Sequence, residues 1–219
     1  MKKLNLGSGT ECLDDWINID NSFNARLAKS PRLRYLLFKL NFLSKKHYDV
    51  DWADHIHKIM IRDVSKKLPF DNESIDYIYS SHLIEHLNKE VGEKLLQECF
   101  RVLKKGGLFR LIIPDLELFA NNYIKEITDT QNSMDNTDFL MSERFLDQLN
   151  MSEKTRIPLI IKTLHPEHKW MYDQYSLTAL LTSCGFTAIR KMSYKEGDCP
   201  DIELLDNRPE ESLYLEASK

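Results

Sequence analysis

Short apolar runs that alternate with helical patterns are the feature of this sequence that most constrains its fold. Five runs are strand-like: Lys3–Leu6, Trp16–Ile19, Lys58–Ile61, Ile75–Tyr79 and Leu108–Ile113. Most are nearly continuous in apolar character, which is typical of parallel strands covered on both faces. Because such strands are joined by right-handed crossovers, the sequence predicts an α/β fold with a layered, mostly parallel sheet.

Two helical patterns and two alternating runs complete the expected elements. The first helix begins at a capping Asn88, and the Lys-Lys-Gly-Gly run at 104–107 is expected to close it. The second helix runs from about Gln174 to Cys184. Thr187–Ser193 and Ser212–Ala217 then alternate like strands, and they predict an antiparallel edge of the sheet.

Glycines and polar residues follow several of the predicted strands. They are Gly7–Gly9, Asp20, Asp63, Ser80-Ser81-His82 and Pro114-Asp115. Ligands of open α/β sheets bind at the carboxyl ends of the strands, so these residues predict one site. Glycines let the backbone approach a ligand closely, and a carboxylate at the next strand end can accept hydrogen bonds from ribose hydroxyls.

The Gly-x-Gly turn does not by itself identify a nucleoside site. Cys12 stands where the third glycine of the dinucleotide fingerprint would be, and a plain strand turn explains Gly7 and Gly9 equally well. The other strand-end residues are what make a nucleoside cofactor the favoured interpretation.

Composition excludes several classes of protein. The 219 residues suit one domain with a sizeable core, and the net charge of −4 gives no general attraction to nucleic acid. Four widely spaced cysteines without a Cys-x-x-Cys motif suit a reduced, cytoplasmic protein rather than a disulfide scaffold or a zinc ribbon. No apolar run approaches the ~20 residues of a membrane span, and the first residues are typical of a strand rather than a signal peptide.

With these motifs in order, the chain resembles the class I S-adenosylmethionine-dependent methyltransferases, and most closely the methyltransferase type 11 group. The resemblance is carried by LNLGSG at 4–9, INID at 17–20, and the stretches 62–87 and 98–115, while 168–186 is similar to the tail of that group. It implies a three-layer Rossmann-like sheet with an antiparallel C-terminal edge, one domain over residues 1–219, and S-adenosylmethionine as cofactor.

The resemblance also implies a set of cofactor-binding residues. The backbone of Leu6, Gly7, Ser8 and Gly9 would border the methionine part, and Asp20 would hold the ribose hydroxyls. The remaining members would surround the adenine and the methionine moiety, namely Asp63, Val64 and Ser80.

Two residues are candidates for catalysis. His82 would point towards the transferred methyl group and could act as general base for a hydroxyl acceptor, or it could only shape the pocket. Asp115 could bind the acceptor or assist as base, or it could cap the helix that starts at Leu116.

Two further motifs contain potential metal ligands. His82-Leu83-Ile84-Glu85-His86 matches the inverted zincin pattern H-x-x-E-H, in which both histidines lie on one helix face. Because His82 ends a strongly predicted strand, a metal hydrolase is disfavoured and no metal site is expected. The run 165–170, which contains His165, Glu167 and His168, could contact an acceptor or a metal, but a structural role at the start of the late helix is favoured.

The chain departs from the family pattern at its first crossover. Asp20 follows Gly9 by only 11 positions, so the first helix is at most one or two turns, and the family's upstream helix is missing. The insert Asn21–Ala53 is expected to cover the resulting gap. Residues 26–46 contain seven Lys and Arg and no Asp or Glu, so this part could be a lid, a packing helix, or a helix that docks on an anionic surface or lipid-linked substrate.

The favoured function is methyl transfer from S-adenosylmethionine to a small-molecule or saccharide-type acceptor, at oxygen. The insert 116–165 follows the fifth strand and is expected to select the acceptor. The saccharide acceptor rests on analogy with relatives of the family. Ser80-Ser81-His82-Leu83 differs from the Asn/Asp-Pro-Pro-Tyr motif of amino-methylating DNA enzymes, so nucleic acid is disfavoured as substrate.

Two other functions were weighed against methyl transfer. A non-catalytic S-adenosylmethionine-binding regulatory module is the main alternative, since it would keep the cofactor residues without an active acceptor side. A nicotinamide-dependent oxidoreductase is disfavoured by the missing third glycine and by the region around Asp63.

Overall fold

One sheet organises the part of the chain that the structure describes. The computed structural model describes residues 1–9, 11–43, 58–133, 141–149, 151 and 167–219. Within these residues the sheet has seven strands in the order β3-β2-β1-β4-β5-β7-β6. The first five strands of that order pair in parallel, and β7 runs antiparallel to both β5 and β6. The predicted mostly parallel sheet with an antiparallel C-terminal edge is confirmed.

The strands lie where the apolar runs predict them. Their bounds are β1 (Lys3–Leu6), β2 (Trp16–Asp20), β3 (Ile59–Ile61), β4 (Ile75–Ser81), β5 (Leu103–Pro114), β6 (Thr187–Met192) and β7 (Ser212–Ser218). One boundary was wrong. Helix α4 (Lys89–Val102) ends before the Lys-Lys-Gly-Gly run, which already belongs to β5 because Leu103 pairs with Ile75 of β4.

The larger core lies between one face of the sheet and two helices. Strand side chains alternate between faces, so Leu4 and Leu6 of β1 point to the same side as Leu111 and Ile113 of β5. Helix α4 and helix α8 (Gln174–Ser183) cover this side, and α8 contributes Leu177 and Leu181 to the core. Helix α8 begins at Gln174, as predicted, and Asp173 starts it with a capping box.

The other face of the sheet is covered by the segment between β6 and β7. Trp16 of β2 and Tyr79 of β4 pack there with Ile202 and Leu205 of the short helix α9 (Ile202–Leu205). The indole Nε1–H of Trp16 donates to Asp201, 2.9 Å away. The expectation that the insert Asn21–Ala53 covers the gap at the first crossover stays a prediction: its Ala25 packs with Cys12 of the crossover and Ile59, while 44–53 lie outside the described residues.

A buried ion-pair network fixes that segment to the sheet. Arg110 of β5 is fully buried, and its guanidinium donates to the carboxylates of Asp206 and Glu216 and to the carbonyls of Ser193 and Glu196. All of these partners lie on the β6–β7 segment or on β7. Their hydrogen bonds compensate for the removal of three charged groups from water.

The first crossover is a loop in its described residues, 11–15. Asn5 of β1 donates to the Glu11 carbonyl at 2.8 Å, and Asn18 of β2 donates to the Leu13 carbonyl at 3.0 Å. The buried side-chain amides of Asn5 and Asn18 thus hold the crossover loop in place. A longer crossover would have a helix at this position.

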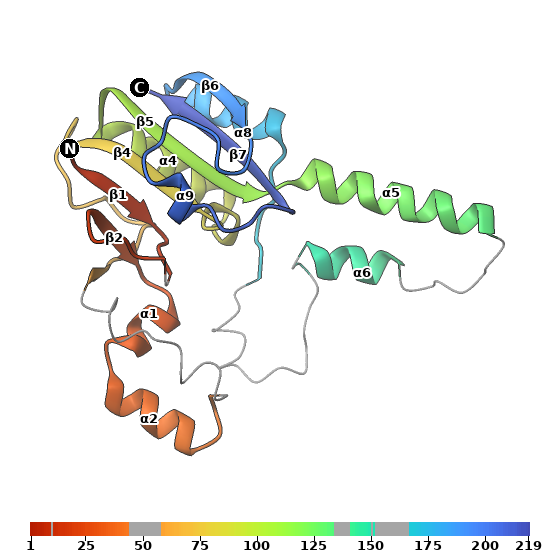
Figure 1. Ribbon diagram of the computed structural model, residues 1–219, viewed down its shortest axis with the longest axis horizontal. Coiled ribbons are helices and arrows are strands. Elements are labelled where there is room, and N and C mark those ends of the chain that lie inside the picture. The colour runs from red at the N-terminus through yellow and green to blue at the C-terminus, as the bar shows by residue number, and fades with distance from the viewer. Residues whose placement is uncertain (10, 44–57, 134–140, 150, 152–166) are drawn as a thin grey trace.

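The inserts extend away from the sheet. Helices α1 (Phe23–Ala28) and α2 (Pro31–Lys39) follow β2, and α5 (Leu116–Ser133) projects outward from β5 with α6 (Met141–Gln148) beside it (Figure 1). Tyr123 and Phe145 stack between α5 and α6 with ring centroids 4.6 Å apart. Among the described residues, no helix is both long enough and apolar enough to span a membrane. The parts of the two inserts at 44–53, 134–140, 150 and 152–165 lie outside the described residues.

Candidate functional site

The glycine turn follows β1 at the carboxyl edge of the sheet. Gly7 has φ +69° and Gly9 has φ +52°, a left-handed conformation that favours glycine. The amides of Gly7 and Ser8 donate to the Ile19 carbonyl of β2 at 2.8 and 3.1 Å. A Cβ on Gly7 would lie 3.1 Å from Leu83, whereas one on Gly9 would meet no atom within 4 Å. The turn is therefore tightly packed at Gly7 and open at Gly9.

Asp20 ends β2 beside this turn. Its side chain is buried, and its two oxygens accept hydrogen bonds from the backbone of Gly9 at 2.8 Å and of Ser22 at 2.6 Å. The carboxylate therefore fixes the turn and the start of α1. Each oxygen retains a second lone pair with which to accept a ligand hydroxyl.

A cavity of about 190 Å³ opens next to the turn. The glycine turn and the end of β4 form one wall, and the segment after α9 forms the other. Its lining includes Gly7, Gly9, His82, Asn207 and Arg208. The sequence did not single out Asn207 and Arg208, because no motif marks the loop between the two antiparallel strands.

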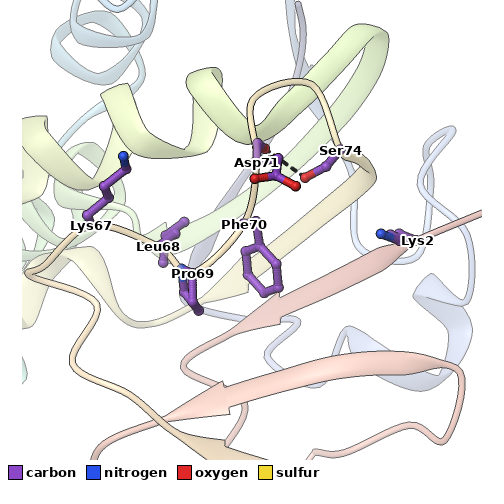
Figure 2. A pocket seen from close by; sticks show the side chains of 7 residues that line it. All are labelled: Lys2, Lys67, Leu68, Pro69, Phe70, Asp71 and Ser74. Carbon is purple, nitrogen blue, oxygen red and sulfur yellow. Dashed lines mark hydrogen bonds between the residues drawn. The ribbon is translucent and has the colours of Figure 1, made fainter.

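A larger cavity lies at the opposite edge of the sheet. It measures about 440 Å³ and is lined by residues such as Lys2, Phe70 and Ser74 (Figure 2). Lys2 precedes β1 and Ser74 precedes β4, so this cavity is at the amino ends of the strands. Ligands of such sheets bind at the carboxyl ends, so the smaller cavity is the candidate site.

The remaining predicted cofactor residues lie along the carboxyl edge. Asp63 follows β3, is exposed, and accepts hydrogen bonds from the backbone and hydroxyl of Ser65, which lower its pKa. The next residue, Val64, is buried in the main core. Ser80 is buried in β4 and pairs with Leu6 of β1. None of these three lines the cavity beside the glycine turn.

His82 lies between the cavity and the end of β7. It has φ +49°, and its Nε2 is 2.8 Å from the hydroxyl oxygen of Ser212. Burial, together with the positive charge of Arg208, lowers the pKa of His82 to about 3. The imidazole is therefore neutral at physiological pH and a weak proton acceptor, which favours a role in shaping the pocket over general base.

Asp115 caps a helix. Its Oδ1 accepts hydrogen bonds from the backbone of Glu117 at 3.1 Å and of Leu118 at 3.4 Å, at the start of α5. The capping interpretation of Asp115 is confirmed, while its contact with an acceptor stays a prediction.

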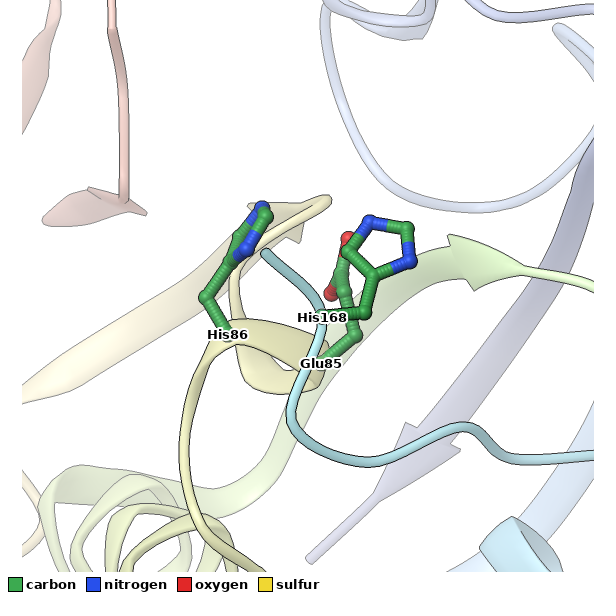
Figure 3. Close-up of side chains that lie close together, drawn as sticks. All are labelled: Glu85, His86 and His168. Carbon is green, nitrogen blue, oxygen red and sulfur yellow. The ribbon is translucent and has the colours of Figure 1, made fainter. Parts of the chain in front are cut away.

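The H-x-x-E-H run does not form one helix, in agreement with the expectation that His82 ends a strand. Strand β4 continues to Ser81, and only Ile84–His86 form a single 3₁₀ turn, η2, so His82 and His86 do not share the face of an α-helix. Glu85 and His86 instead meet His168 from the segment before α8 (Figure 3). The amides of Lys169 and Trp170 donate to the Glu85 carbonyl at 2.7 and 3.2 Å, which holds this segment against the turn. His165 lies outside the described residues.

Comparisons with known proteins concern the fold and part of the sequence rather than the site. Residues 40–111 match the model of a family described as "Methyltransferase domain". An uncharacterized protein of Haemophilus influenzae is 33% identical over 84 residues, which is 38% of this chain and 33% of that protein. The match thus spans about a third of that curated relative's length.

Solved structures share the fold at low sequence identity. A SAM-dependent methyltransferase from Archaeoglobus fulgidus aligns with a TM-score of 0.54 at 13% identity, over 100% of this chain and 86% of the other. The YcgJ protein of Bacillus subtilis aligns with a TM-score of 0.50 at 12% identity, over 100% and 91% of the two chains. At such identities the likeness concerns the fold.

Proposed function

We propose that the chain is a class I S-adenosylmethionine-dependent methyltransferase and that it transfers a methyl group from this cofactor to a hydroxyl of a small-molecule or saccharide-type acceptor. The observation that carries the proposal is the cavity between the glycine turn and the 193–211 segment, with Asp20 buried at the neighbouring strand end. The domain extending over residues 1–219 is part of the same proposal.

The residues at the carboxyl edge fit S-adenosylmethionine. The open space beside Gly9 admits a ligand against the backbone, and Asp20 offers carboxylate lone pairs for the ribose hydroxyls. Asp63 is exposed two strands from β1 in the sheet, where the adenine amino group would find a carboxylate. When bound, the cofactor supplies an electrophilic methyl group on a sulfonium.

The acceptor side of the cavity is polar. Ser81, His82, Asn207 and Arg208 line it, and they can donate or accept hydrogen bonds. Methyl transfer is an in-line displacement, so the main task of these residues is to orient the acceptor oxygen towards the methyl group. The Ser212 hydroxyl holds the His82 ring in place for that task. Hydroxyl-rich acceptors, such as saccharides, match such a lining.

Calorimetry with S-adenosylmethionine, S-adenosylhomocysteine and NAD tests the cofactor assignment. We expect the first two to bind more tightly than NAD, and Asp20→Ala to weaken their binding about 10- to 100-fold, because hydrogen bonds to a charged group contribute about 1.5–3 kcal/mol. Asp71→Asn is the matched control, since Asp71 is exposed and lies by the cavity at the opposite edge. Equal affinities in wild type and Asp20→Ala would overturn the site.

An acceptor panel then separates catalysis from binding alone. Release of S-adenosylhomocysteine with alcohols, saccharides and amines measures turnover. Turnover with hydroxyl acceptors supports the proposal, whereas turnover confined to amines overturns the oxygen assignment. Cofactor binding without turnover on any acceptor would favour the non-catalytic regulatory module.

A further inference from the structure

A buried carboxylate without a partner lies beside the cavity. Glu85 is 1% exposed, and within the part of the chain that the structure describes neither of its side-chain oxygens has a hydrogen-bond partner. The nearest ionisable group is the His82 ring, whose Nδ1 is 3.5 Å from Oε1. An unpaired buried charge costs several kcal/mol, and the 3.5 Å separation from His82 Nδ1 is long for a hydrogen bond. A bound cation would satisfy both oxygens.

Two histidines flank this carboxylate. Figure 3 shows the Glu85 carboxylate close to the rings of His86 and His168, whose centroids are 4.9 Å apart. One potential ligand atom from each of the three residues lies within 4.8 Å of the others. In a tetrahedral site with bonds of about 2.1 Å, ligand atoms are about 3.4 Å apart, so small side-chain rotations close the site.

Backbone carbonyls orient both rings for metal binding. His86 Nδ1 is 3.2 Å from the Glu167 carbonyl, so this nitrogen donates and Nε2 carries the lone pair. The Leu149 backbone hydrogen-bonds His168, while His168 Nδ1 is buried without a partner. The lone pairs of His86 Nε2 and His168 Nδ1 therefore remain for a ligand. Carbonyl partners of this kind fix the ring tautomer in known metal sites.

We propose that Glu85, His86 and His168 bind a divalent transition-metal ion at the carboxyl edge of the sheet. Two imidazoles and one carboxylate suit Zn²⁺, Fe²⁺ or Co²⁺ better than Mg²⁺ or Ca²⁺, which prefer oxygen ligands. Both histidines are half-buried, which leaves a path for the ion.

The metal site also bears on the acceptor. Three protein ligands leave a fourth position open, and Glu85 contacts His82, which lines the cavity. A bound ion would offer this position to an oxygen of the acceptor. This part rests on the proposed methyl transfer, whereas metal binding itself does not.

Zinc titration of the chelator-treated protein tests the site. We expect one Zn²⁺ per chain, and at least about tenfold weaker binding in Glu85→Gln and in His168→Ala. Glu90→Gln is the matched control because Glu90 is exposed at the start of α4. Wild type without stoichiometric zinc, or Glu85→Gln that binds zinc as wild type does, would overturn the site. Circular dichroism checks folding, and should Glu85→Gln unfold, His168→Ala decides the question.

Two readouts separate this inference from the proposed function. Calorimetry that finds S-adenosylmethionine binding but no zinc overturns the metal site alone. Zinc binding with neither cofactor binding nor turnover overturns methyl transfer and its acceptor role, and leaves the metal site supported. Equal turnover on hydroxyl acceptors in zinc-free and zinc-loaded protein would overturn the acceptor role.

Discussion

Replacing Arg110 by methionine tests the network that fixes the 193–211 segment. The guanidinium is fully buried and donates to Asp206 and Glu216. Arg110→Met therefore leaves the Asp206 carboxylate without its ion-pair partner and Glu216 with only the half-exposed Arg190, 3.4 Å away. Removing one partner from a buried ion pair costs about 3–5 kcal/mol. Backbone amides still donate to both carboxylates. We therefore expect the free energy of unfolding to fall by about 4 kcal/mol, the cost of one broken pair rather than of two.

Urea denaturation followed by circular dichroism at neutral pH measures this loss. With a slope of about 2 kcal/mol per M, the midpoint should fall by about 2 M. Arg190→Met is the matched control, because the Arg190 side chain is 51% exposed although it also contacts Glu216. The control should lose less than about 1 kcal/mol. Equal losses in the two variants would refute the claim that the buried network anchors the segment.

Two further substitutions test the turn and the cover of the sheet. Gly7→Ala should raise the Kd for S-adenosylmethionine about tenfold in calorimetry. The left-handed φ at this position and the contact with Leu83 strain any side chain there by about 1–2 kcal/mol. An unchanged Kd contradicts a tight turn at the cofactor. Asp201→Asn should lose about 1 kcal/mol at pH 7. Hydrogen bonds from Lys3 and Trp16 lower the pKa of Asp201, so its stabilisation is present above the ordinary value of about 3.9 and is lost as pH falls through the lowered pKa. In thermal melts from pH 7 to 2, the difference in melting temperature between Asp201→Asn and wild type should therefore disappear in acid. A difference that stays constant contradicts the ion pair.

The sequence predicted the strands well because burial on both faces leaves a strong local signal. β1 and β4 lie in the middle of the sheet, and their apolar runs start where the strands start. The α4–β5 boundary was missed since lysines and glycines also suit a helix end. The structure places them in a strand because Leu103 pairs with Ile75, a contact that local patterns do not encode.

The strand ends that carry the predicted site residues were located correctly, but the contacts of these residues were not foreseen, and their binding roles stay predictions. Asp20 lies at the expected strand end, yet its hydrogen bonds to Gly9 and Ser22 depend on the fold around the turn. The pairing of His86 with His168 joins segments far apart in the chain, and no local sequence pattern indicates it. A buried carboxylate without a partner becomes visible only when the neighbours of Glu85 are placed.

Residues 193–211 cover the second face of the sheet, and this has a consequence for folding during synthesis of the chain. A chain leaving the ribosome completes β1, β2, β4 and β5 before this segment exists, so Trp16 and Tyr79 face water until the C-terminal third follows. The wall that carries Asn207 and Arg208 is also missing until then. The ligand cavity is therefore one of the last features to form, and a nascent chain holds an incomplete sheet that exposes aromatic surface to chaperones.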